Sequence, residues 1–168
     1  MAATYTPIAT YTVSGSSTAT ITFSSIPSTY TDIVAVANCA TSSGNSSLYG
    51  RINGDTGTNY SWTYLYGNGS TAASGRVAPA GNVICGYYVT PATGFDFVSI
   101  TNYQNYANTT TYKTVLSRAN STASSYPGAE ESVTLWRNTA AINQIQFYIG
   151  TGNFVAGSTF TLYGILAA

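Results

Sequence analysis

The acidic side chains are the first residues to consider for chemistry, because the chain has no histidine. Without imidazole, the chain cannot build a Ser-His-Asp or Cys-His nucleophile system, or a zinc site that depends on histidine. Glu130 and Glu131 are adjacent. On a strand they would point to opposite faces, which would prevent them from acting together as general acid and general base. We therefore expect them to be a solvated pair in a loop.

Asp55 lies in a turn-like segment, residues 54–59, that resembles part of a calcium loop. A calcium ion takes about six to eight oxygen ligands, usually from several carboxylates, whereas this segment offers one carboxylate. We expect Asp55 to be a turn residue, and we expect Asp32 and Asp96 to lie in turns or at strand edges. The sequence thus predicts no catalytic residue, no metal site and no cofactor.

Aromatic side chains are the strongest candidates for binding. Residues 60–66 place an aromatic ring at every second position, which puts four rings on one face of a strand. That face is either a platform for sugar rings, an intersubunit surface or half of a sandwich core, and burial in a core or between subunits is favoured. Two further tyrosines, in residues 102–106, are expected to be exposed. The candidate interaction surface consists of Tyr60, Trp62, Tyr64, Tyr66, Tyr103 and Tyr106.

The elements that must position these side chains are strands. A two-residue alternation of apolar and polar residues recurs along the chain, for example in residues 19–23, 95–98 and 145–149, and no window shows helical spacing. We count ten or eleven candidate strands with turn signals between them. The fold class predicted is an all-β antiparallel β-sandwich or barrel. The unbroken apolar run within Asp32–Ala37 predicts a central strand covered on both faces.

Turns and loops divide the strands. Asn53-Gly54 and Gly67-Asn68-Gly69 carry the positive φ angles of tight hairpins. Three segments are interpreted as loops that could contact partners, namely residues 40–46, 69–81 and 121–128. Cys39 and Cys85 lie in apolar, strand-like runs, and we expect two buried free thiols, with a disulfide as the alternative.

Charge is scarce in the 168 residues. Five Lys plus Arg balance five Asp plus Glu, so 6% of residues are charged and the net charge is zero, against about 25% charged residues in a typical domain. Scattered cations argue against nucleic-acid binding, which needs them clustered. The absence of an apolar run long enough for a membrane span argues against membrane insertion, and the N-terminus has no signal-peptide pattern. We expect one domain, residues 1–168, that associates readily because little self-repulsion keeps copies apart.

Four stretches together resemble small virion structural proteins of tailed bacteriophages. They are residues 52–60, 100–103, 142–145 and 157–165, and the likeness extends from about residue 20 to the end of the chain. In that family such modules are capsid decoration proteins or tail-fibre domains. The resemblance implies a jelly-roll sandwich, and it carries no catalytic residue over to this chain.

The expected function is therefore that of a capsid decoration or cement protein. We expect a homotrimer on the capsid exterior of a bacteriophage virion that binds the major capsid protein and stabilises the shell, without enzymatic activity. The alternative is a tail-fibre or tail-tip module that binds a receptor or glycan; a chain that begins at Met1 without a shaft or coiled coil favours decoration. A third class, a glycan-degrading enzyme, would need a carboxylate pair for which no spacing in the sequence argues.

Overall fold

Side chains alternate between core and solvent along the strands, as the two-residue period predicts. In the computed structural model, which describes residues 4–15, 18–123 and 127–166, strand β9 (Lys113–Ser121) buries Val115, Ser117 and Ala119 and turns Thr114 and Arg118 outward. The described residues form twelve strands, most of which alternate in this way, and they contain no helix; all pairings of these strands are antiparallel. The predicted all-β antiparallel sandwich is confirmed.

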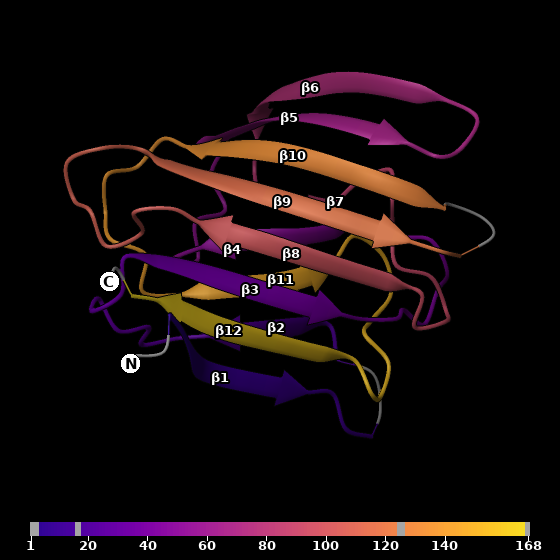
Figure 1. Ribbon diagram of the computed structural model, residues 1–168, viewed down its shortest axis with the longest axis horizontal. Helices are drawn as coiled ribbons and strands as arrows, with labels where there is room; N and C mark the ends of the chain where they lie inside the picture. Colours follow the sequence, from indigo (N-terminus) through magenta and orange to yellow (C-terminus); the bar gives the residue numbers. More distant parts are fainter. Residues whose placement is uncertain (1–3, 16–17, 124–126, 167–168) are drawn as a thin grey trace.

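The strands form two sheets that pack face to face (Figure 1). Apart from β9, the strands are β1 (Tyr5–Thr12), β2 (Thr20–Phe23), β3 (Asp32–Asn38), β4 (Leu48–Ile52), β5 (Tyr60–Gly67), β6 (Ala72–Ala80), β7 (Val83–Gly86), β8 (Phe97–Tyr103), β10 (Gly128–Trp136), β11 (Ile145–Ile149) and β12 (Thr159–Ile165). The large sheet has eight strands in the order β1-β12-β3-β8-β9-β10-β5-β6. The small sheet has four, in the order β2-β11-β4-β7.

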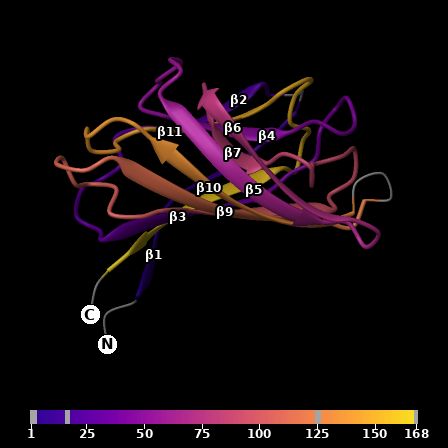
Figure 2. The ribbon, with the colours of Figure 1, turned by 90° about the horizontal axis from the view of Figure 1, so that it is seen from above.

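The connectivity is that of a jelly roll with two inserted hairpins. If the β5–β6 and β9–β10 hairpins are set aside, the remaining eight strands have the orders β1-β12-β3-β8 and β2-β11-β4-β7. Successive strands of this set alternate between the sheets, except for β4 and β7, which pair with each other. This is the eight-stranded double Greek key of a jelly roll, as expected. The two layers are seen from above in Figure 2, with both chain ends at one side because β1 pairs with β12.

The inserted hairpins widen the large sheet beyond β8, and β7 packs across their inner face (Figure 1). Strand β7 is an edge of the small sheet, and an edge strand leaves backbone groups without partners in a neighbouring strand. Hydroxyl groups on the inner face of the large sheet bind two of these backbone groups. Thr134 Oγ1 accepts from the Ile84 N–H at 3.3 Å, and Ser99 Oγ donates to the Cys85 carbonyl at 2.7 Å. These bonds explain why Ser and Thr side chains occupy core-facing positions under β7.

The core between the sheets is rich in aromatic side chains. The largest fully buried rings are Trp136, Tyr60, Tyr103, Tyr106, Phe97, Phe147, Phe154 and Phe160. Cys39 and Cys85 are buried free thiols, as expected. Strand β3 lies between β12 and β8, as expected for a central strand. Its outer face is not fully covered as predicted, since Val34 on that face is buried but Val36 is only half-buried.

The predicted loops and turns are confirmed only in part. Residues 69–81 were interpreted as a loop because their side chains are small; that prediction is wrong, since residues 72–80 form β6, a strand held by pairing with β5. Asn53 and Gly54 have the predicted positive φ angles, but they lead from the small sheet to the large one and close no hairpin. Residues 40–46 contain no strand, as expected. The third predicted loop falls partly outside the described residues, at 124–126.

Candidate interaction surfaces

The first half of the aromatic row belongs to the core. Tyr60 is fully buried, its ring stacks on Trp136 with centroids 6.3 Å apart, and its hydroxyl accepts a hydrogen bond from the Ile52 N–H at 3.2 Å. Burial raises the pKa of Tyr60 to about 12. Trp62 is buried as well. These two residues are therefore corrected from candidate binding residues to core residues, because β5 begins under the small sheet.

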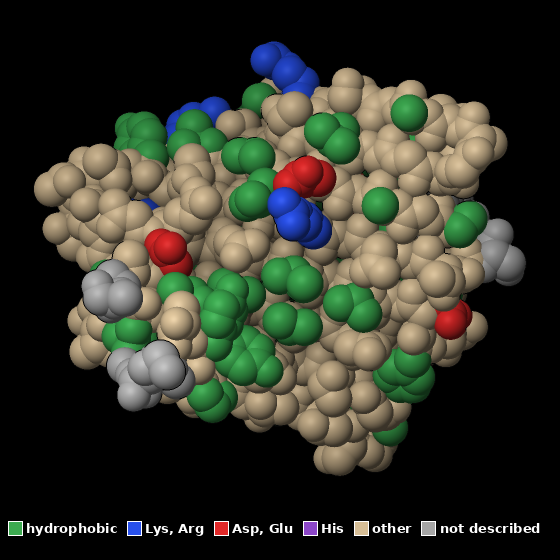
Figure 3. Space-filling view, viewed as in Figure 1, with side chains coloured by type: hydrophobic (Ala, Val, Ile, Leu, Met, Phe, Trp, Pro, Cys, Tyr) green, Lys and Arg blue, Asp and Glu red, His purple; other side chains and the backbone are tan. Residues whose placement is uncertain are grey.

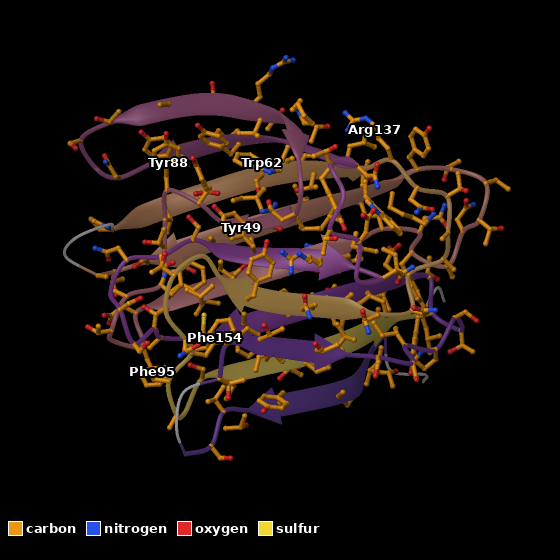
Figure 4. All side chains as sticks on the ribbon, turned by 180° about the vertical axis from the view of Figure 1, so that it is seen from behind. Tyr49, Trp62, Tyr88, Phe95, Arg137 and Phe154 are labelled. Carbon is orange, nitrogen blue, oxygen red and sulfur yellow. The ribbon has the colours of Figure 1, made fainter. Side chains whose placement is uncertain are left out.

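The second half of the row forms an aromatic cluster at the edge of the sandwich. Tyr64 and Tyr66 are half-buried and meet Tyr87 and Tyr88, which follow β7. Tyr66 and Tyr88 stack with centroids 4.3 Å apart and planes 7° apart. A hydrogen bond with Tyr88 raises the pKa of Tyr64 to about 12. We call these four residues the tyrosine cluster; Figure 4 labels Tyr88 at this edge, on the small-sheet side.

Glu130 holds the chain segment that carries half of the cluster. Its carboxylate accepts hydrogen bonds from the backbone N–H groups of Tyr87, Tyr88 and Val89, the shortest being 2.7 Å from Tyr88. Burial raises the pKa of Glu130, and the three N–H donors offset only part of that rise. The prediction of a loop is wrong for both residues, since Glu130 and Glu131 lie on β10. The side chain of Glu130 is buried in the core, where it is the acceptor for three backbone N–H groups, and only Glu131 keeps contact with solvent.

A hollow of about 300 Å³ adjoins the cluster. It is lined by Asn45, Ser47, Tyr87, Tyr88 and Thr90. Ser47 donates a hydrogen bond to the Tyr87 carbonyl at 3.3 Å, whereas the buried hydroxyl of Thr90 has no hydrogen-bond partner among the described residues. The sequence analysis missed residues 87–90, although two adjacent tyrosines after an apolar run are a signal that a strand ends in an aromatic segment.

Tyr103 and Tyr106 are not part of any exposed surface. Both are fully buried, which contradicts the prediction, and neither ring contacts the tyrosine cluster. Tyr103 continues the inward positions of β8 after Phe97, Ser99 and Thr101, a period-two signal that would have predicted its burial. The hydroxyl of Tyr106 donates to the Pro27 carbonyl.

The outer face of the large sheet carries a second surface that the sequence analysis did not single out. Strand register places Ile100, Arg118, Glu131 and Leu65 directly opposite one another on β8, β9, β10 and β5. Arg118 and Glu131 form an ion pair of 3.2 Å at the centre of this row. On this face, Figure 3 shows a basic and an acidic side chain in contact near the centre, with apolar and uncharged side chains around them. We call this row and its neighbours Leu116 and Val133 the outer-face patch.

The apolar members of the outer-face patch are accessible. Leu65, Val133 and Ile100 are 58%, 47% and 41% exposed, and a hollow of about 410 Å³ lies between Leu65, Ile100 and the ion pair. Exposed large apolar residues are normal when scattered, but a contiguous group marks an interaction site. The mutually neutralised pair leaves the patch without net charge.

The remaining acids have structural roles. Asp55 accepts hydrogen bonds from the Gly57 N–H at 2.8 Å and from Trp136 Nε1 at 2.7 Å, as a turn residue would. Burial is the largest single influence and raises its pKa, but the hydrogen bonds from Trp136, Asn59 and Gly57 together lower it below the ordinary value. Asp32, at the start of β3, accepts from the Asn105 N–H at 2.6 Å. Glu130 and Glu131 point to opposite faces of β10, so they share no common space.

Among the residues that the structure describes, no three His, Cys, Asp or Glu side chains come together in a way that could hold a metal ion. Over the same ranges, the chain has no helix with the length and apolar character needed to cross a membrane.

The fold and these surfaces define a jelly-roll β-sandwich with a widened sheet. No model of a known protein family matches the chain, and no curated protein matches it. Among solved structures, it is similar to a protein of unknown function from Shewanella oneidensis MR-1, at 14% identity and a TM-score of 0.33, covering 98% of this chain and 77% of that one. A likeness this weak carries no argument about function.

Proposed function

We propose that this protein is a structural component of a tailed-bacteriophage virion, a decoration protein that binds the outside of the capsid and stabilises it. The partner is the major capsid protein, and the role is binding without catalysis. The observation that carries the proposal is the outer-face patch, a neutral and largely apolar area on a broad sheet. Jelly rolls are frequent in viral capsid proteins.

The outer-face patch suits contact with a large, fixed surface. Burying apolar area contributes roughly 25 cal/mol per Å², and a stable protein interface needs about 1,200–2,000 Å² in total. The eight-stranded sheet supplies a broad face for such a contact. Because Arg118 and Glu131 form an ion pair at 3.2 Å, burying them together costs less than burying either charge alone.

Stabilisation of the shell follows from mass action. A protein that binds the assembled shell and not its separated subunits lowers the free energy of the assembled state by its binding free energy at every site. We propose a homotrimer, which multiplies the contacts that each decoration unit makes with neighbouring capsid subunits.

The test is the copy number of this chain in purified particles, together with the heat stability of particles stripped of it. Hundreds of copies per particle and a lower disruption temperature after stripping support decoration of the capsid. A handful of copies, or an unchanged disruption temperature, overturns it.

The second candidate is a tail-fibre or tail-tip module that binds a receptor or glycan on the host surface. The observation that favours it is the tyrosine cluster with its adjoining hollow, because exposed aromatic rings and neutral polar groups are typical of adaptable contact surfaces. Copy number separates the candidates, since a tail tip carries few copies.

A further inference from the structure

We propose that the hollow beside Tyr88 binds a single neutral saccharide ring. The hollow lies on the small-sheet side of the molecule: Tyr64 and Tyr66 share the inward side of β5, and Leu65 of the outer-face patch points the opposite way. The hollow can therefore hold a ligand while the outer-face patch contacts a capsid. The inference holds wherever in a virion the protein sits, and it can be tested on the isolated chain.

The aromatic wall of the hollow is fixed before a ligand arrives. Tyr66 covers one face of the Tyr88 ring at 4.3 Å, and Tyr87 meets it edge-on at 4.9 Å. The backbone N–H of Tyr88 donates a hydrogen bond to the Glu130 carboxylate. The Tyr88 side chain nevertheless remains 37% exposed. A preorganised ring binds with little loss of side-chain entropy, and its apolar surface can cover the C–H groups of a sugar.

The polar groups of the hollow are neutral and include one that lacks a partner. Asn45 and Ser47 offer an amide and a hydroxyl at the rim. Thr90 is 5% exposed, and its hydroxyl forms no hydrogen bond within the described part of the chain. That oxygen has almost no exposed surface, so the polar groups that a ligand in the hollow can reach are those of Asn45 and Ser47. A ligand with several hydroxyl groups is therefore the chemical match.

Charge and size narrow the ligand class. No Lys or Arg lines the hollow, so phosphates, nucleotides and acidic sugars lack a counter-charge. The Glu130 carboxylate is occupied by three backbone N–H groups and is not free for a cationic ligand. A purely apolar ligand would give the Asn45 amide and the Ser47 hydroxyl no hydrogen-bond partner. A volume of about 300 Å³ is at the small end of ligand pockets, which fits one ring.

The experiment uses the purified full chain and a panel of methyl pyranosides of glucose, galactose, mannose and N-acetylglucosamine. Saturation-transfer difference NMR should show millimolar binding of at least one sugar, with its C–H protons saturated most strongly. Tyr88→Ala should weaken that binding at least about tenfold. Tyr112→Ala, which removes another exposed tyrosine outside the hollow, should leave it unchanged.

Asn45→Ala tests the amide at the rim of the hollow. Because Asn45 is exposed, the variant should fold with unchanged stability, yet it should bind the sugar at least about threefold more weakly. The proposal is overturned if no sugar of the panel shows transfer, if Tyr88→Ala or Asn45→Ala binds as well as the wild type, or if glucuronate or inorganic phosphate binds better than every neutral sugar. None of these results depends on the copy number or stability of particles, so they are distinguishable from a failure of the decoration role.

Discussion

The ring of Tyr64 on β5 occupies the space that a side chain at Gly75 on β6 would need. The two residues are directly paired across the strands, and a β-carbon built at Gly75 would lie 2.7 Å from Cζ of Tyr64. Strand β6 is the edge of the large sheet. A ring that covers a glycine in an edge strand fixes the register of the pair and anchors the tyrosine cluster.

Gly75→Ala should therefore destabilise the protein by about 1–3 kcal/mol, because the new methyl group displaces the ring. The same change at an unobstructed strand position would be neutral or slightly stabilising. Urea unfolding, followed by tyrosine fluorescence, measures the effect. In a Tyr64→Ala background the penalty should vanish, since the ring that causes it is gone.

Gly67→Ala is the matched control on β5, where an added β-carbon would meet its nearest atom at 4.0 Å and the backbone has no positive φ. Its effect should stay within about 0.5 kcal/mol. Equal losses for the two glycine variants would show that Tyr64 does not cause the penalty at Gly75.

Glu130→Ala should destabilise the protein by about 2–4 kcal/mol, because three backbone N–H groups lose their acceptor. Glu130→Gln should lose less, since its amide oxygen can still accept. Near-ultraviolet circular dichroism should report a loosened tyrosine cluster in the alanine variant. The neighbouring Glu131→Ala breaks only the exposed ion pair and should cost less than about 1 kcal/mol; a loss as large as that of Glu130→Ala would contradict this account.

Stability should also depend on pH through Glu130. The folded-state pKa of this carboxyl is raised above the ordinary value of 4.5, mainly by burial, so the folded state holds the proton more tightly than the unfolded state. The contribution of Glu130 to stability is then fully present below pH 4.5 and is lost as pH rises through the folded pKa. As pH rises across that window, the unfolding free energy of the wild type should fall relative to that of Glu130→Gln, because the amide of Gln does not titrate. A difference that is flat with pH would contradict the raised pKa.

Neither cysteine should react with a thiol reagent in the native protein at pH 8. Burial raises the pKa of Cys85 to about 12 and raises the pKa of Cys39 well above its usual value, and the thiolate is the reactive form. Both should react in strong denaturant without a reductant. Reaction of the native protein would show that the thiols are accessible, and no reaction in denaturant would reveal a disulfide.

Alternation carried most of the fold prediction. The inward residues of β11, Ile145, Phe147 and Ile149, are buried as their spacing indicates. Strand β6 was missed because small residues such as Ala72, Ala73 and Gly75 carry no alternation, and pairing with β5 across the sheet decides their structure. The order of strands in the sheets depends on contacts between distant segments, which local patterns do not encode.

The binding surfaces were predicted less well. Alternation identified the face of β5 that carries Trp62 and Tyr66. Which residues of that face the small sheet covers and which it leaves accessible depends on tertiary structure, which the alternation does not show. The burial of Glu130 could not be predicted, because its donors are backbone groups more than forty residues earlier in the chain. The outer-face patch arises from the registers of four strands, so no single segment of the sequence displays it.

The most direct test of the decoration role is rebinding of the purified protein to stripped capsids. The wild type and Thr20→Asp, which adds a charge on the exposed side of β2 in the small sheet, should rebind. Leu65→Asp and Val133→Asp should fail, because each places a carboxylate in the outer-face patch. All variants should retain native circular dichroism, since both apolar side chains are exposed. Rebinding of Leu65→Asp and Val133→Asp at wild-type occupancy would contradict the assignment of this face to the capsid.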